Sequence, residues 1–163
     1  MSNAQKAATW LPRFCFQRTI TGGPPEMETR VVAASQTIKV GDPLVLNAGK
    51  IEKADAADTK IYGVSASNVT TTAADEGYLC TAYVANDDSV FTAQCDAASS
   101  GIADGATCDI IASGTSWLLD IGASVTDVVL VKKHVDGDDT SDAVDFGRLE
   151  FIWNKHYTDG TLV

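Results

Sequence analysis

The chain has 163 residues, with 12 basic and 22 acidic side chains and a formal net charge of −10. This length suits one domain with a buried core, and the apolar content of 45% is ordinary for a globular protein. The acidic balance argues against a body that binds nucleic acid or an anionic membrane, because both need clustered Lys and Arg. We recognise neither a membrane-spanning run nor a signal peptide, and expect synthesis in the cytoplasm.

The first 25 residues differ from the rest of the chain in charge. They contain three basic residues and no acidic one, which leaves nine basic and 22 acidic side chains for the remainder. A Gly-Gly-Pro-Pro cluster at residues 22–25 separates this segment from the remainder of the chain. We therefore predict an extended N-terminal arm over residues 1–27 and a β-rich domain over residues 28–163.

The arm supplies the candidate partner-binding residues. Its aromatic side chains would fill pockets on a neighbouring subunit, and its arginines would pair with acidic groups around those pockets. Phe14 and Phe16 are two residues apart, so a strand would point both to one face, as in strand addition to a partner's sheet. The alternative is that the segment forms the first strand of the chain's own body. The predicted contact residues are Trp10, Arg13, Phe14, Phe16 and Arg18.

Short apolar runs alternate with turn residues from Glu28 onward, a pattern typical of an antiparallel sandwich or barrel. Short turns at residues 47–49, 86–88 and 113–115 predict three hairpins. The fold class is therefore predicted to be mainly β: a small antiparallel barrel or sandwich, β-tulip-like, with the extended arm. The predicted strands are residues 29–34, 37–40, 44–46, 50–53, 60–65, 77–85, 89–95, 107–112, 116–121, 127–135 and 148–153.

The chain shows no recognised catalytic or nucleotide-binding motif. His134 and His156 are the only histidines, and no local motif groups either one with a nucleophile. The Gly63–Ser67 stretch starts like a nucleophile elbow but lacks its closing glycine. The four cysteines form no CxxC pair and are predicted to be small buried hydrophobic residues. We predict no catalytic residue, cofactor or metal, and thus a protein that is not an enzyme.

An acidic run extends from Asp136 to Asp145. Five carboxylates in ten residues could bind a cation such as Ca²⁺. Counted from Asp136, however, Ser141 and Gly147 stand where an EF-hand loop requires Gly and Glu. A solvated acidic loop is the interpretation that we prefer.

Three segments carry a resemblance to a known group of proteins. They are Ile38–Leu46, with a Gly-Asp turn before an apolar strand, Gly49–Ile51, which reads as a return strand, and Ile61–Ala66, with a Gly-Val-Ser strand. This stretch of residues 30–70 resembles the capsid decoration proteins of tailed phages, also called cement or head-stabilisation proteins. In that group similar short patterns recur in a small β-rich body.

The resemblance implies a noncatalytic virion protein, often a homotrimer, that is made in the host cytoplasm. It would bind the outer surface of the capsid and clamp neighbouring major capsid protein subunits, with no nucleic acid or membrane partner. One alternative is another virion protein, such as a tail-tube or head–tail component. Another is a small carbohydrate- or ligand-binding β-domain that uses Trp117 or Trp153 as a stacking platform.

Overall fold

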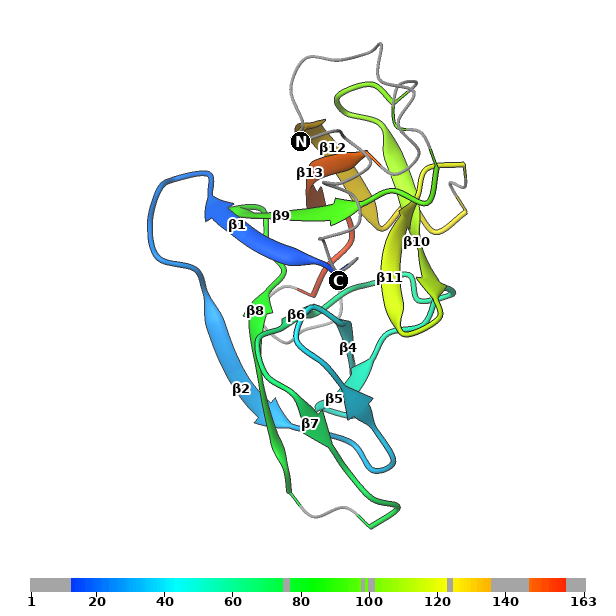
Figure 1. Cartoon of the computed structure of the whole chain (residues 1–163). Coiled ribbons are helices and arrows are strands. Elements are labelled where there is room, and N and C mark those ends of the chain that lie inside the picture. The colour runs from blue at the N-terminus through cyan, green and yellow to red at the C-terminus, as the bar shows by residue number, and fades with distance from the viewer. Residues whose placement is uncertain are drawn as a thin grey trace, which may run out of the picture.

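Two antiparallel sheets dominate the molecule (Figure 1). Strands account for 52% of the structure, no helix is present in the described part, and the sheets do not close into a barrel. The prediction of a mainly β, sandwich-like fold is thus confirmed. The described residues contain no helix that could cross a membrane. The structure is a computed structural model that describes residues 13–74, 77–97, 99, 102–122, 125–135 and 147–157.

The larger sheet has six strands, and buried apolar side chains alternate with more exposed ones most clearly in β13. In β13, for example, Leu149, Phe151 and Trp153 are fully buried. This alternation follows from the two-residue period of a strand. In spatial order the strands are β1 (Cys15–Thr19), β9 (Ser89–Gln94), β13 (Arg148–Trp153), β12 (Val129–His134), β10 (Thr107–Ser113) and β11 (Ser116–Asp120).

The second sheet has five strands, and a two-stranded ribbon accompanies it. At Gly63 the backbones of β6 and β8 approach closely, since a Cβ there would overlap the backbone carbonyl of Tyr83. Only a residue without a Cβ therefore fits at this position. In spatial order the strands are β2 (Met27–Val31), β8 (Leu79–Val84), β6 (Gly63–Ser65), β4 (Pro43–Asn47) and β5 (Lys50–Lys53), and the ribbon is β3 (Thr37–Ile38) with β7 (Val69–Thr70).

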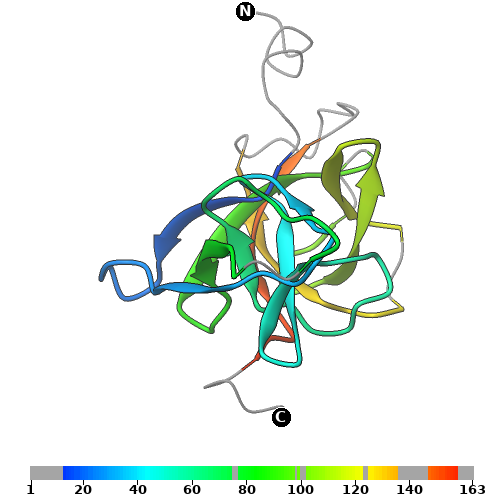
Figure 2. The same ribbon diagram turned by 90° about the horizontal axis from the view of Figure 1, so that it is seen from below.

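The five-stranded sheet buries side chains on both of its faces. One face, with Val45 and Val64, joins the aromatic inner face of the six-stranded sheet in the larger core cluster. The other face, with Leu44 and Ile51, forms a smaller aliphatic cluster that includes Ile38 of the ribbon. Viewed from below, the β1–β2 connection lies on the opposite side of the molecule from the β10–β11 hairpin (Figure 2).

Two of the three predicted hairpins are confirmed, and one is wrong. Strands β4 and β5 pair with each other, as do β10 and β11. Strands β8 and β9 belong to different sheets, although they flank the predicted turn at residues 86–88. The Asn86 side chain accepts hydrogen bonds from the backbone N–H groups of Asp88 and Ser89, at 3.0 and 2.8 Å. This turn therefore carries the chain from one sheet to the other.

The N-terminal segment also departs from the prediction. Strand β1 pairs antiparallel with β9, and β2 starts at the last residue of the predicted arm. From Arg13 onward the chain belongs to the folded body, which corrects the predicted arm over residues 1–27 for its second half. Residues 1–12 lie outside the described residues. The alternative interpretation, a first strand of the chain's own body, holds for Cys15–Thr19.

Candidate functional site

Of the predicted partner-binding aromatics, Phe14 lies inside the chain's own core and Phe16 is partly buried against it. Phe14 is 1% exposed and meets Phe151 and Trp153 edge to face, with ring centroids 5.7 and 5.4 Å apart. Phe16 stacks on Tyr83 of the other sheet at 4.9 Å, so it joins the two sheets. These contacts use the aromatic geometries that stabilise cores. Phe14 is fully buried in this chain, which corrects its predicted role as an anchor in a neighbouring subunit, whereas for Phe16 that role stays a prediction.

The arginines of the segment differ in what they contact. Arg13 donates to the carbonyl oxygen of Val40 at 3.2 Å, beside Gly41. A Cβ on Gly41 would lie 2.8 Å from the Cβ of Arg13, so only glycine lets the two segments approach this closely. Arg18 is half exposed and points to the outer face of the six-stranded sheet. Trp10, the fifth predicted residue, lies outside the described residues.

The outer face of the six-stranded sheet carries a network of charged and polar side chains, which we call the charged face. Glu150 is at its centre, with only 11% of its side chain exposed. Its two oxygens bind Arg18 of β1 at 3.0 Å and Lys133 of β12 at 3.4 Å. The charged face comprises Gln17, Arg18, Thr92, Lys133, Arg148 and Glu150.

Thr92 organises the rest of the charged face. Its buried hydroxyl accepts hydrogen bonds from Gln17 at 3.1 Å and from Arg148 at 2.9 Å. Thr92 and Glu150 are directly opposite each other in the pairing of β9 with β13. The face thus spans four neighbouring strands, and strand pairing sets the positions of its charged residues relative to one another. The sequence reasoning missed Glu150, Lys133 and the arginine of β13, although the polar positions between the apolar residues of β13 were a visible signal.

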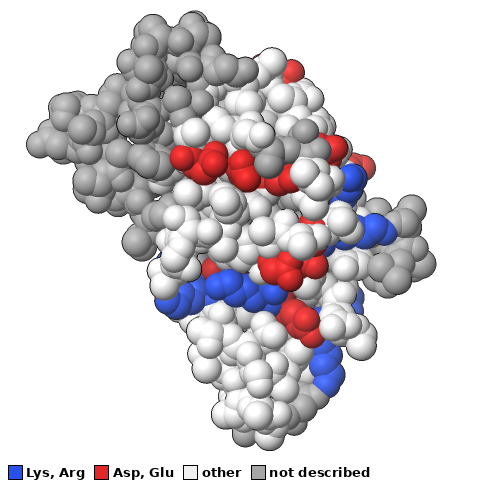
Figure 3. Space-filling view, turned by 90° about the vertical axis from the view of Figure 1, so that its right-hand side faces the viewer, with Lys and Arg blue, Asp and Glu red and all other residues white. Residues whose placement is uncertain are grey.

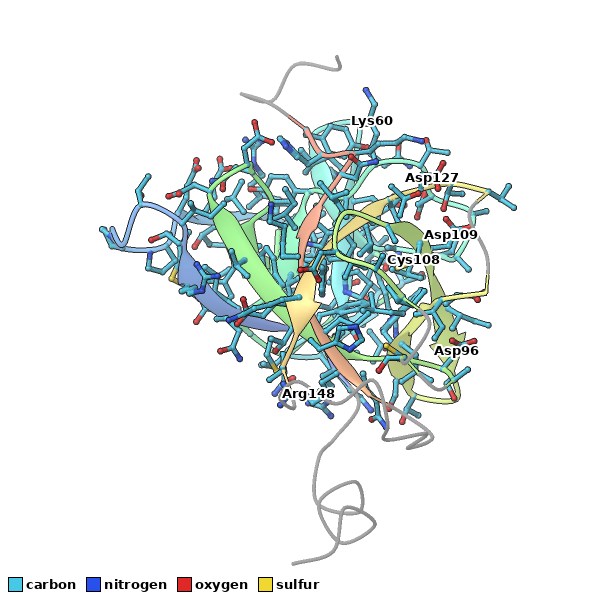
Figure 4. All side chains as sticks on the ribbon, turned by 90° about the horizontal axis from the view of Figure 1, so that it is seen from above. Lys60, Asp96, Cys108, Asp109, Asp127 and Arg148 are labelled. Atoms are coloured by element: carbon cyan, nitrogen blue, oxygen red, sulfur yellow. The ribbon has the colours of Figure 1, made fainter. Side chains whose placement is uncertain are left out.

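Acidic side chains form a row on a different face, the one that carries β10 and β11, and uncharged residues separate this row from a shorter stripe of basic side chains (Figure 3). Asp109 and Asp127 lie close together, whereas Arg148 lies well apart from them (Figure 4). Asp109 accepts backbone N–H bonds from Val125, Thr126 and Asp127 at 2.6–3.1 Å. This carboxylate therefore holds the loop before β12 against β10.

The environment of Asp109 favours its charged form. Burial by itself would raise the pKa of this carboxyl group, but the backbone N–H donors of the loop outweigh it and lower the pKa below its usual value. Asp127 has a positive φ of 51°, and its carboxylate accepts a hydrogen bond from Thr107 at 2.8 Å. These acids are thus engaged in loop structure, and no metal-ligating cluster occurs among the described residues.

The histidines and cysteines are engaged in local contacts. Nε2 of His134 lies 3.0 Å from the carbonyl oxygen of Ile102, and Nε2 of His156 lies 3.1 Å from Asp87. All four cysteines are free. Cys80, Cys95 and Cys108 are buried as predicted, while Cys15 is exposed. Burial is the largest influence that raises the pKa of the Cys95 and Cys108 thiols to about 12, so both stay protonated and unreactive.

The two tryptophans considered for ligand stacking are buried. Trp117 is 3% exposed and Trp153 is fully buried in the larger core cluster. Neither presents a ring face on which a sugar could stack. The run from Asp136 to Asp145, considered as a calcium site or a solvated loop, lies outside the described residues.

Comparison with protein-family models, with curated proteins and with solved structures finds no match for this chain.

Proposed function

We propose that this protein is a noncatalytic structural protein of a phage virion. It binds the outer surface of the capsid as a homo-oligomer and stabilises the shell by clamping neighbouring major capsid protein subunits. It needs no cofactor for this role. The observation that carries the proposal is the charged face, where Arg18, Lys133 and Glu150 hold fixed positions across the strands of one sheet.

A rigid charged face suits attachment to a repeating lattice. Fixed charges select a partner surface of complementary potential and suppress wrong partners. Each copy can bind weakly, because oligomers that engage several lattice sites gain avidity. A protein that binds the assembled shell better than its free subunits stabilises that shell by mass action.

The segments that carry the resemblance to decoration proteins form one contiguous unit. Gly-Asp-apolar and Gly-Lys-apolar segments supply β4 and β5, and the Gly-Val-Ser segment supplies β6, the other neighbour of β4. Asp42 is buried, accepts the backbone N–H of Lys39 at 2.9 Å and binds Lys53 at 3.3 Å. These short patterns thus specify a single three-stranded unit, which supports the resemblance as more than scattered similarity.

Co-sedimentation with capsid shells that lack the protein tests this function. We expect the wild type to pellet with the shells and to raise their melting temperature. The double variant Arg18→Glu/Lys133→Glu reverses two charges of the charged face and should lose most of this binding. The control variant Lys39→Glu/Lys60→Glu makes the same change in net charge elsewhere and should still bind.

Three outcomes would count against the proposal. A wild-type protein that ignores the shells would remove capsid attachment. Equal losses in the two double variants would show that overall charge, not the charged face, decides binding. Tubes or rings of pure protein in electron microscopy would favour a tail-tube or head–tail role instead.

A further inference from the structure

The two main sheets have four edge strands, and intrachain contacts occupy or distort three of them. Strand β1 carries a register shift between Phe16 and Arg18, and such a bulge hinders pairing with another strand. At β11 the backbone of Asp96 donates to the carbonyl oxygen of Leu119 at 2.9 Å. At β5 the backbone of Ala33 donates to the carbonyl oxygen of Ile51 at 2.9 Å.

The fourth edge, β2, has a regular ladder, and over its first part no other described strand pairs with its outer side. All five residues pair in register with β8, without a bulge. The strand runs along the outside of the molecule, with β8 as its sheet neighbour (Figure 1). Strand β5 meets this edge at the end of β2, where Val32 and Ile51 form a parallel bridge. Met27 and Thr29, further along the edge, are exposed.

The hydrogen-bond alternation shows which backbone groups point outward. Val32 donates to Tyr78, and Val84 donates to Glu26, so the even-numbered residues of this stretch bond to β8. In an antiparallel pair the residues between them point their N–H and C=O groups to the other side. The outward donors and acceptors of the open part therefore belong to Met27 and Thr29.

We propose that the β2 edges of two copies pair antiparallel about a two-fold axis at Thr29. This register joins two five-stranded sheets into one continuous sheet. It places Thr29 of one copy opposite Thr29 of the other, and Met27 of each copy opposite Val31 of the other. The paired stretch ends at Val31, because β5 lies against the edge from there on. An interface between identical surfaces must be self-complementary in this way.

The charges of β2 fit the same register. Glu28 of each copy faces Arg30 of the other, so two opposite-charge pairs form across the axis. Both side chains already hold their positions: Arg30 binds Glu28 at 2.7 Å, and its Nε donates to the Tyr62 hydroxyl at 3.2 Å. The same hydroxyl donates to Glu28. Ordering side chains before association reduces the entropy lost on binding.

The opposite face of β2 adds apolar contacts. Met27 is 47% exposed and Leu79, which pairs with Val31, is 58% exposed. In the proposed register, Leu79 and Val31 of one copy form a single row of side chains with Met27 and Tyr83 of the other. Two exposed apolar side chains per copy thereby enter a cross-strand row, where they pack against neighbours on the same face. Thr29, whose hydroxyl lies 2.9 Å from that of Thr81, fills the central row.

This pairing goes beyond attachment to a capsid and does not depend on it. The β2 edge belongs to the five-stranded sheet and the charged face to the six-stranded sheet. A dimer would therefore present two charged faces at once. The pairing is two-fold, in contrast to the three-fold association that the resemblance to decoration proteins implies.

A charge-exchange experiment tests the register. Light scattering over a concentration series should show the wild type approaching twice the monomer mass of 17.1 kDa. Glu28→Arg alone and Arg30→Glu alone place like charges opposite each other and should each be monomeric. Mixed in equal amounts, the two variants should form a heterodimer, because each facing pair between unlike copies can again have opposite charges. Circular dichroism of each variant checks that it is folded.

A cross-link tests the axis. Residues opposite each other in a hydrogen-bonded antiparallel pair have Cα atoms about 5.5 Å apart, within the range of a disulfide. In a Cys15→Ser background, Thr29→Cys should form a covalent dimer on mild oxidation, while Thr37→Cys, on an exposed position of β3, should not.

Four results would overturn the pairing: a monomeric or trimeric wild type, dimers of a single charge variant, no recovery on mixing, or equal cross-linking at both cysteine positions. The charged-face double variant should remain dimeric. Loss of shell binding with retained dimers therefore concerns the proposed function only, and loss of dimers in the β2 variants concerns this inference only.

Discussion

Strands β1 and β2 are both five-residue edge strands near the start of the chain, yet they are held in opposite ways. The β1 segment inserts Phe14 and Phe16 into the aromatic core, and its ladder with β9 is bulged. Strand β2 keeps a regular ladder, and Met27 and Thr29 remain exposed. Strand β1, which was predicted to be part of a partner-binding arm, is thus anchored in the chain's own body. Strand β2, for which no binding role was predicted, has the exposed edge.

The largest expected effect is a difference in stability between a variant of the β1 segment and a variant of β2. Phe14→Ala should lower the free energy of unfolding by about 3–5 kcal/mol, because it removes a fully buried ring and leaves a cavity. Met27→Ala, at an exposed position of β2, should change it by less than about 0.5 kcal/mol. Urea denaturation measures both, and similar losses would remove the contrast between the strands.

Proline substitutions sharpen the contrast within β2 itself. Arg30→Pro removes a backbone bond to β8 and should cost roughly 3 kcal/mol of folding free energy, by analogy with proline in other hydrogen-bonded positions. Thr29→Pro removes only an outward N–H, a position that edge strands tolerate. It should therefore abolish dimers while the monomer stays folded. Thermal unfolding and light scattering measure the two effects, and a Thr29→Pro protein that unfolds would place that N–H in an intrachain bond.

The hydroxyl of the buried Tyr62 beneath β2 gives a smaller, pH-dependent effect. Burial, helped by the hydrogen bond to Glu28, raises the pKa of Tyr62 well above its usual value of 10. Its contribution to stability is thus fully present below the pKa of the unfolded chain, near 10, and is lost as the pH rises further. Tyr62→Phe should cost about 1 kcal/mol at neutral pH and flatten the alkaline decline. An unchanged decline in urea titrations between pH 9 and 11 (roughly spanning the free tyrosine pKa) would contradict this.

The smallest effect belongs to the outer side of β1. Arg18 is half exposed, so its ion pair with Glu150 is screened by solvent. Arg18→Ala should lower the free energy of unfolding by less than about 1 kcal/mol, and less still at high salt. Denaturation at two salt concentrations checks this. A loss as large as that for Phe14→Ala would show that the ion pair holds β1 as strongly as its rings do.

Local patterns were enough to predict much of the fold. The alternation of Leu149, Phe151 and Trp153 determines which side of β13 is buried, because side chains alternate along any strand. The β4–β5 and β10–β11 hairpins were predicted because their short turns contain glycine and connect adjacent strands. The burial of three of the four cysteines also followed from residue type and context.

Long-range pairing was beyond such patterns. A turn at residues 86–88 looks alike whether its flanking strands pair or pass into different sheets, so the hairpin there was wrong. The charged face could be seen only once β1, β9, β13 and β12 lay side by side. Local residue patterns therefore encode the strand periodicity, the short turns and the mainly β class. The packing of Phe14 on Phe151, and the edge of β2 that no other described strand fully covers, depend instead on which distant strands become neighbours.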